Sequence, residues 1–286
     1  MSTGNFLRTA LCAGLLAGSG TAAAFEVRLT PPDPRPGDIL QVEVIGLDNP
    51  VRAECLFRAT AYPLYPVAPG RLRALIGLPA HTPPGEYPLR VRRKGFLLPA
   101  AVKTALVTVP NRKFTHQRIT MTQQKARLPG GPSARDALQL IRRTLQVESR
   151  KQLWRGRFLR PAKGRQTSDY GHSRTVNDKA SWAWHKGVDY SARLGSEIIA
   201  PAAGRIILRG HFPIQGRLLI LDHGQGLMSA FMHLKTFRVD HGDTVRAGAR
   251  LGDIGTSGFS TAPHLHWGVY LHGAPVDPVP LLERKL

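Results

Sequence analysis

Proline and glycine interrupt this chain often, which suits short strands and many turns more than a helical bundle. The 286 residues include 29 glycines and 23 prolines, and paired turn signals stand at Pro36-Gly37, Pro69-Gly70 and Pro84-Gly85. Between these turns apolar and polar residues alternate, which is typical of short strands with one buried face. The chain is therefore predicted to be mainly β, with enough length for one large domain or two ordinary ones.

Residues 25–110 are predicted to form a small β-sandwich of immunoglobulin-like type. Five alternating segments would supply strands, namely Glu26–Leu29, Ile39–Ile45, Arg73–Gly77, Tyr87–Val91 and Ala105–Val109. Nothing in this domain is typical of a catalytic site. Spacing, docking or shielding of a site elsewhere, or a purely structural role, are the functions expected of it.

Residues 111–157 are predicted to be a linker with one helix. Apolar residues at near-helical spacing, from Ala134 to Leu145, predict this helix over about 133–150. Ser133, with Asp136 three residues later, resembles a capping box at its start. The Pro-Gly-Gly-Pro run at 129–132 predicts a stiff hinge just before the helix.

Residues 158–286 return to strand patterns and are predicted to form an antiparallel, partly closed β-sheet. Glycine-bearing turns separate the segments, and no long helical stretch is expected among them. The expected strands are Ile198–Ala200, Gly204–Leu208, Leu218–Leu221, Leu227–Met232, Thr244–Leu251 and Leu265–Leu271.

The first 24 residues follow the pattern of a secretory signal peptide. Arg8 is the only charge, a short apolar run follows, and small residues at Ala22–Ala24 mark a cleavage site. We therefore expect export to the periplasm or cell envelope, or secretion, with no transmembrane segment after cleavage. Cleavage would leave Cys55 as the only cysteine, which excludes an intramolecular disulfide.

The chain carries a formal net charge of +21, which predicts an anionic partner. Its arginine clusters lie in no recognisable nucleic-acid module, and an exported protein rarely meets nucleic acid. Anionic envelope polymers and peptidoglycan carboxylates are the expected partners. The alternative is a general bias toward arginine with no meaning for binding. The sequence indicates no oligomeric state.

Two short strings carry groups that bind metal ions: His185-Lys-Gly-Val-Asp189 and His264-Leu-His266. On a straight strand His185 and Asp189 would lie roughly 13 Å apart, at ~3.3 Å per residue, which is too far to share one ion comfortably. Gly187 lies midway and permits a bend that brings them together. His264 and His266 are two residues apart, so on a strand they point to the same face while Leu265 points into the core.

These strings belong to a longer ordered set of motifs over roughly residues 154–278. The set includes Ser168–Gly171 with Arg174, His185–Tyr190, Met232–Leu234, Ser260–His266 and Val276–Pro278. On these motifs the sequence resembles the lysostaphin or LytM-type zinc endopeptidases of bacterial cell-wall metabolism. The resemblance implies that Zn²⁺ is held by His185, Asp189 and His266, and that His264 and His233 are the catalytic histidines.

The same resemblance implies the reaction, which is hydrolysis of the peptide cross-links of peptidoglycan. A zinc-activated water would attack the stem-peptide bond with histidine acid/base help. A D-alanyl to meso-diaminopimelyl bond and a glycine bridge both stay open as the bond cut.

Two other functions also stay open. One is a regulatory or autoinhibited wall-binding protein that controls another wall hydrolase, with the β-sandwich covering the cleft. The other is a non-haem Fe(II) oxygenase, because two histidines and one carboxylate also make a facial triad.

Overall fold

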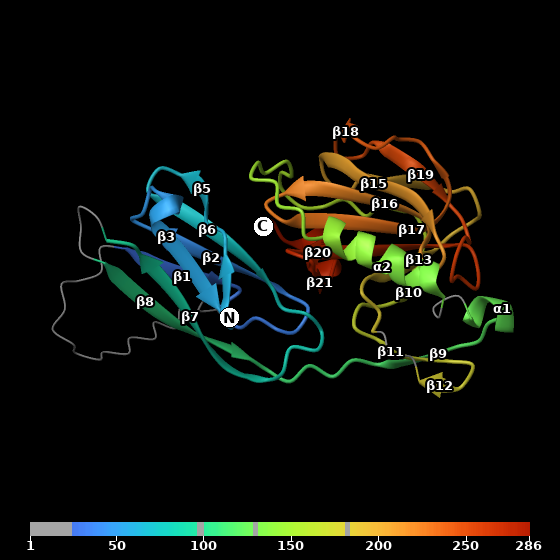
Figure 1. Cartoon of the computed structure of the whole chain (residues 1–286), viewed down its shortest axis with the longest axis horizontal. Coiled ribbons are helices and arrows are strands. Elements are labelled where there is room, and N and C mark those ends of the chain that lie inside the picture. The colour runs from blue at the N-terminus through green and yellow to red at the C-terminus, as the bar shows by residue number, and fades with distance from the viewer. Residues whose placement is uncertain (1–24, 96–99, 128–130, 181–183) are drawn as a thin grey trace, which may run out of the picture.

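The computed structural model describes residues 25–95, 100–127, 131–180 and 184–286. Figure 1 shows two β-rich bodies side by side, with the N-terminal strands in one and the strands from β10 onward in the other. The prediction of a mainly β chain with antiparallel sheets is confirmed. The predicted signal peptide lies outside the described residues, and among those described no helix is long and apolar enough to span a membrane.

The N-terminal body consists of two four-stranded antiparallel sheets around one core. Val42 and Ile76 of the first sheet pack in the same buried cluster as Cys55 and Val91 of the second. This is a sandwich, and its immunoglobulin-like topology stays a prediction. The first sheet has the order β1 (Glu26–Thr30), β2 (Ile39–Ile45), β6 (Arg71–Gly77), β5 (Tyr65–Ala68), and the second β4 (Thr60–Tyr62), β3 (Ala53–Phe57), β7 (Gly85–Arg93), β8 (Ala101–Val109), with the short 3-10 helix η1 (Pro50–Arg52) between β2 and β3.

The C-terminal body is built on a ten-stranded sheet in which every pair of neighbours is antiparallel. Its main path runs β10 (Arg165–Ser168), β13 (Val188–Ser191), β20 (His264–Leu271), β17 (Leu227–Phe237), β16 (Gly216–Gly224), β15 (Gly204–Phe212), β18 (Thr244–Val245), with β14 (Glu197–Ile199), β19 (Arg250–Ile254) and β21 (Ala274–Val276) at its sides. The single strand predicted over Thr244–Leu251 is two strands, because the chain turns at Gly248, whose φ is +80°.

The predicted helix is present as α2 (Pro132–Thr144) but starts and ends differently from the prediction. Gly131 is the N-cap residue and makes no side-chain cap bond, so the capping box predicted at Ser133 is wrong. Pro132 takes the first helical position, where its missing N–H costs nothing. The helix ends well before residue 150, because the chain then runs beside the β16–β17 turn, where Leu153 N–H donates to the His223 carbonyl.

Residues 111–157 are built into the C-terminal body rather than strung between two domains. Strand β9 (His116–Ile119) pairs in parallel with β11 (Ser173–Val176), which also pairs with β12 (Lys179–Ala180). A second helix, α1 (Gln123–Ala126), follows β9, whereas one helix was predicted. Ile141 and Leu145 of the α2 region pack on the ten-stranded sheet, in one buried cluster with Leu218 and Met228. A short helix, α3 (Val279–Glu283), follows β21.

Strand β6 of the sandwich packs against both bodies, one with each of its faces. Leu72, Ala74 and Ile76 face the sandwich core, whereas Leu75 belongs to the C-terminal core. Arg73 is only 6% exposed and donates to the side-chain oxygens of Gln152 and Gln225. Gly77 of this strand lies against Leu271, Ala274 and Val276. The sandwich therefore docks at the end of β20 that is remote from His264 and His266.

Candidate metal centre and cleft

The three predicted metal ligands meet where β13 lies beside β20. Asp189 pairs directly with His266 in the register of these strands, and directly paired residues project their side chains to the same face. His185 comes just before β13, beyond a bend at Gly187. The predicted bend is thus present. Gly187 also allows the backbone to pack closely against β20, because a Cβ there would lie 2.8 Å from the Trp267 carbonyl carbon.

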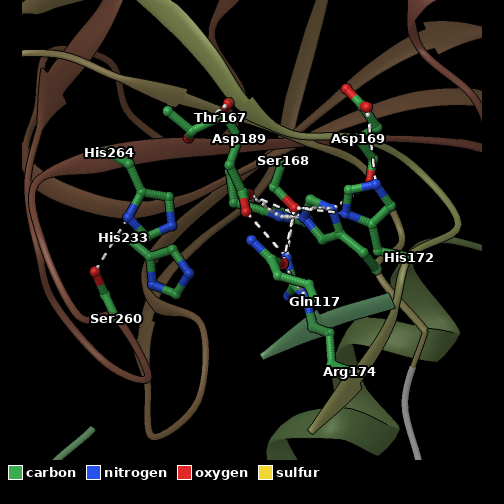
Figure 2. Close-up of polar contacts among 12 residues, drawn as sticks. Gln117, Thr167, Ser168, Asp169, His172, Arg174, Asp189, His233, Ser260 and His264 are labelled. Carbon is green, nitrogen blue, oxygen red and sulfur yellow. Dashed lines mark hydrogen bonds and ion pairs between the residues drawn. The ribbon is translucent and has the colours of Figure 1, made fainter. Parts of the chain in front are cut away.

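The donor atoms of the three side chains form a small triangle. His185 Nε2, His266 Nδ1 and Asp189 Oδ1 lie 2.9 Å from one another. The Nδ1–H of His185 donates to the Asp169 carbonyl at 2.7 Å, which turns the Nε2 lone pair toward the triangle. Figure 2 shows Asp189 between the side of the site that holds His264 and the side that holds Ser168. Two imidazole nitrogens and a carboxylate oxygen at this spacing form a group that can hold one metal ion.

The electrostatics of the triangle keep its carboxylate ionised. Burial alone would raise the pKa of Asp189, but His185 and His266 beside it hold that pKa well below its ordinary value. Arg174 Nη2 donates to the second carboxylate oxygen, Oδ2, at 3.0 Å. Burial lowers the pKa of His266, which favours the neutral, ligating imidazole.

The donor set fits zinc. A tetrahedral zinc with bonds of about 2.0–2.1 Å places its ligand atoms about 3.3 Å apart, close to the spacing of the triangle. Three protein ligands leave one position open, as catalytic zinc sites do. His185, Asp189 and His266 are all buried, and together they form a group able to hold a metal ion.

The two predicted catalytic histidines face each other beside the triangle, with ring centroids 4.8 Å apart. His233 lies at a β-bulge in β17 with φ +66°, and its N–H donates to the Gln215 carbonyl instead of to a neighbouring strand. Its Nδ1–H donates to the Ser257 carbonyl, and that of His264 to the Ala262 carbonyl, each at 2.8 Å. Both rings therefore keep Nε2 as a free base.

The two histidines differ in how deeply their side chains are buried. Burial, together with the nearby His264 and His266, lowers the pKa of His233 to about 3, so its imidazole is neutral. His264 is half-buried at the start of β20, and Ser260 Oγ lies 3.3 Å from its Nδ1 (Figure 2). One base is thus enclosed and the other lies at the rim.

A cleft runs past these histidines, and one of its walls was not predicted. Residues 259–264 form one side, and Gln117, Ile119 and Met121, from the predicted linker, form another. Lys125 of α1 donates to the Ser260 carbonyl and ties the two sides together. The described part of the sandwich lines none of this cleft. The idea that the sandwich covers the cleft is therefore not supported.

Comparison with known proteins agrees with this geometry. Residues 183–278 match the sequence model of peptidase family M23. The C-terminal body therefore holds a segment that is similar to peptidase family M23. A solved structure of a putative peptidase M23 from Pseudomonas aeruginosa aligns over 87% of this chain and 95% of its own, with 26% identity and a TM-score of 0.66. The structural likeness thus extends over most of both chains.

Curated relatives match over shorter stretches. DD-carboxypeptidase/endopeptidase Mpg of Neisseria meningitidis is 36% identical over 99 residues, which are 35% of this chain and 23% of that protein. Murein hydrolase activator EnvC of Escherichia coli is 32% identical over 130 residues, which are 46% of this chain and 30% of that protein. This chain therefore spans less than a third of the length of these relatives.

Proposed function

We propose that the chain is a zinc-dependent endopeptidase that hydrolyses peptide cross-links of bacterial peptidoglycan. The observation that carries this proposal is the donor triangle beside two more histidines whose Nε2 atoms are free. The match of residues 183–278 to peptidase family M23 and the name of the Neisseria relative support the same reaction class.

In this proposal His185 Nε2, Asp189 Oδ1 and His266 Nδ1 hold the metal. Zinc bound there would polarise the scissile carbonyl and make water a nucleophile near neutral pH. His233 and His264 supply the proton transfers, since each presents an unprotonated Nε2 and has its Nδ1–H tied to a backbone carbonyl. Either Nε2 takes a proton from the attacking water and returns one to the leaving amine.

The proposed substrate suits the charge of the chain. Peptidoglycan stem peptides carry carboxylates, and a protein with a formal net charge of +21 attracts them at long range. The predicted signal peptide would bring the protein to the periplasm or cell envelope, where this substrate occurs. Anionic envelope polymers would then retain the protein near the wall.

The test is muropeptide analysis of purified sacculi incubated with the protein, with a chelated sample as control. We expect new cleavage products that the chelator abolishes. His264→Ala should keep bound zinc and lose hydrolysis, whereas His266→Ala should lose the zinc, measured by elemental analysis. Full activity and retained zinc in both variants would refute the assignment, and iron in place of zinc would favour the oxygenase.

A regulatory function is the second candidate, because the Escherichia coli relative is named a murein hydrolase activator. All five predicted metal and catalytic positions are occupied in this chain, which favours the enzyme. The sacculus experiment separates the two functions. If the purified protein releases nothing but raises the cleavage by a second wall hydrolase, the regulatory function holds.

A further inference from the structure

Gln117 of strand β9 lies far upstream of the segment that matches the family model, yet it reaches the metal centre. In the parallel pairing of β9 with β11, Gln117 is the direct partner of Arg174. Directly paired residues project to the same face of a sheet, so both side chains point toward the cleft that Gln117 lines. Figure 2 shows Gln117 next to Arg174 and Ser168.

The hydrogen bonds connect Gln117 to Asp189 in two steps. Gln117 Oε1 accepts from Arg174 Nε and from Ser168 Oγ, each at 3.0 Å. Arg174 Nη2 in turn donates to Asp189 Oδ2 at 3.0 Å and to Ser168 Oγ at 3.1 Å. Ser168 has one hydroxyl hydrogen, which goes to Gln117, while its lone pairs accept from Arg174. One amide oxygen thus orients both groups.

Because Arg174 is largely buried, it depends on Gln117 Oε1 as a hydrogen-bond acceptor. The Arg174 side chain is only 20% exposed, so its guanidinium depends on protein acceptors to offset its lost hydration. Without Gln117 Oε1, the Arg174 Nε–H and the Ser168 hydroxyl both lose their acceptor. The guanidinium is then free to turn toward solvent, and Asp189 Oδ2 loses the donor that orients it.

We propose that Gln117 is a positioning residue of the metal centre, which holds Arg174 against Asp189 so that Asp189 Oδ1 faces the metal. This inference rests on the proposed function for the identity of the metal. Outer groups that orient metal ligands affect metal affinity by about 10–100-fold. Since Gln117 acts through Arg174, we expect the lower end of that range.

The experiment compares Gln117→Met with Gln117→Glu in the full chain. Met has a similar length and no acceptor oxygen, whereas Glu keeps oxygens that accept from Arg174 and Ser168. Zinc affinity, measured by competition with a chromophoric chelator, should fall about tenfold in Gln117→Met and stay near that of the unmodified protein in Gln117→Glu. Gln123→Met, on exposed Gln123 of α1, is the matched control and should change nothing.

A double-mutant cycle excludes a merely structural role. If Gln117 acts through Arg174, then adding Gln117→Met to Arg174→Met should lower the zinc affinity no further. An equal loss in both backgrounds would overturn the proposal, as would unchanged zinc affinity in Gln117→Met alone. Cobalt-substituted protein gives a second readout, because its visible absorption reports ligand geometry and should change in Gln117→Met only.

Kinetics separate positioning from direct substrate contact. A positioning role predicts a lower kcat with little change in KM when zinc is saturating. A raised KM in both variants with unchanged zinc affinity would mean that Gln117 binds substrate in the cleft, and would overturn the inference. The zinc measurements need no turnover, so a protein that binds zinc as expected but cleaves no sacculi refutes only the proposed function.

Discussion

Gly187→Ala tests whether the close contact of β13 with β20 assembles the metal centre. A Cβ at Gly187 would lie 2.8 Å from both the Trp267 carbonyl carbon and Gly268 Cα, and closer still to the Trp267 carbonyl oxygen. Carbon atoms in contact prefer about 3.5–4.0 Å, so the strands must separate by roughly 1 Å. Both neighbours are backbone atoms and have no side-chain rotamer to move.

The consequences follow from where the ligands lie. Asp189 is two residues beyond Gly187, and His266 directly precedes Trp267. Moving β13 away from β20 at Gly187 would therefore also move Asp189 away from His266. Their donor atoms, 2.9 Å apart, would move to nearly 4 Å, beyond the spacing of about 3.3 Å that tetrahedral zinc favours. Overpacking of this kind costs about 1–3 kcal/mol, and a displacement of ~1 Å in an active site costs about 100-fold in rate.

Three measurements check this prediction: zinc content after dialysis, sacculus hydrolysis and thermal unfolding. We expect weaker zinc retention, about 100-fold lower activity and a Tm lower by roughly 2–10 °C. Gly131→Ala is the matched control, because the nearest side-chain atom to its Cβ position is 3.9 Å away. Unchanged zinc retention and activity in Gly187→Ala would refute the reasoning, whatever happens to the Tm.

Two further predictions concern buried titratable groups outside the metal centre. Burial lowers the pKa of His223 to about 4, so the stability it contributes is present above its unfolded pKa of about 6.5 and is lost as the pH falls toward 4. The loss in unfolding free energy between pH 7 and about pH 4.5 should be about 2 kcal/mol smaller in His223→Gln, measured with urea; equal losses would contradict this. Burial raises the pKa of Cys55 to about 12, so thiol reagents at pH 8 should label it only after denaturation. Rapid labelling of Cys55 in the folded protein would show that this part of the sandwich core is open.

Local patterns in the sequence were enough to predict one half of the metal centre. The two-residue spacing of His264 and His266 predicted a shared face, and Leu265 between them is fully buried. Gly187 predicted a bend, which is present. Neither pattern shows which strands are neighbours. The pairing of Asp189 with His266 is a long-range contact, and only the family resemblance connected the two strings before the structure did.

Other features had no local signal. His233 occupies a left-handed conformation at a bulge, and no apolar alternation predicts such a position. The capping prediction failed because Pro132, which favours the first helical position, outweighed the hydroxyl of Ser133. Strands β3 to β5 were missed because they are short and only partly alternating.

The position of β9 changes where the functional unit begins. A boundary at residue 158 keeps all five predicted metal and catalytic residues, and the family match from residue 183 keeps them too. Both boundaries leave out Gln117, which supplies the acceptor for Arg174, and the wall formed by Ile119 and Met121. The predicted metal ligands and the residues that hydrogen-bond around them therefore have different boundaries in the sequence. Because β9 also pairs in register with β11, the segment from His116 onward belongs to the same structural unit as the strand that carries Arg174, the donor to Asp189.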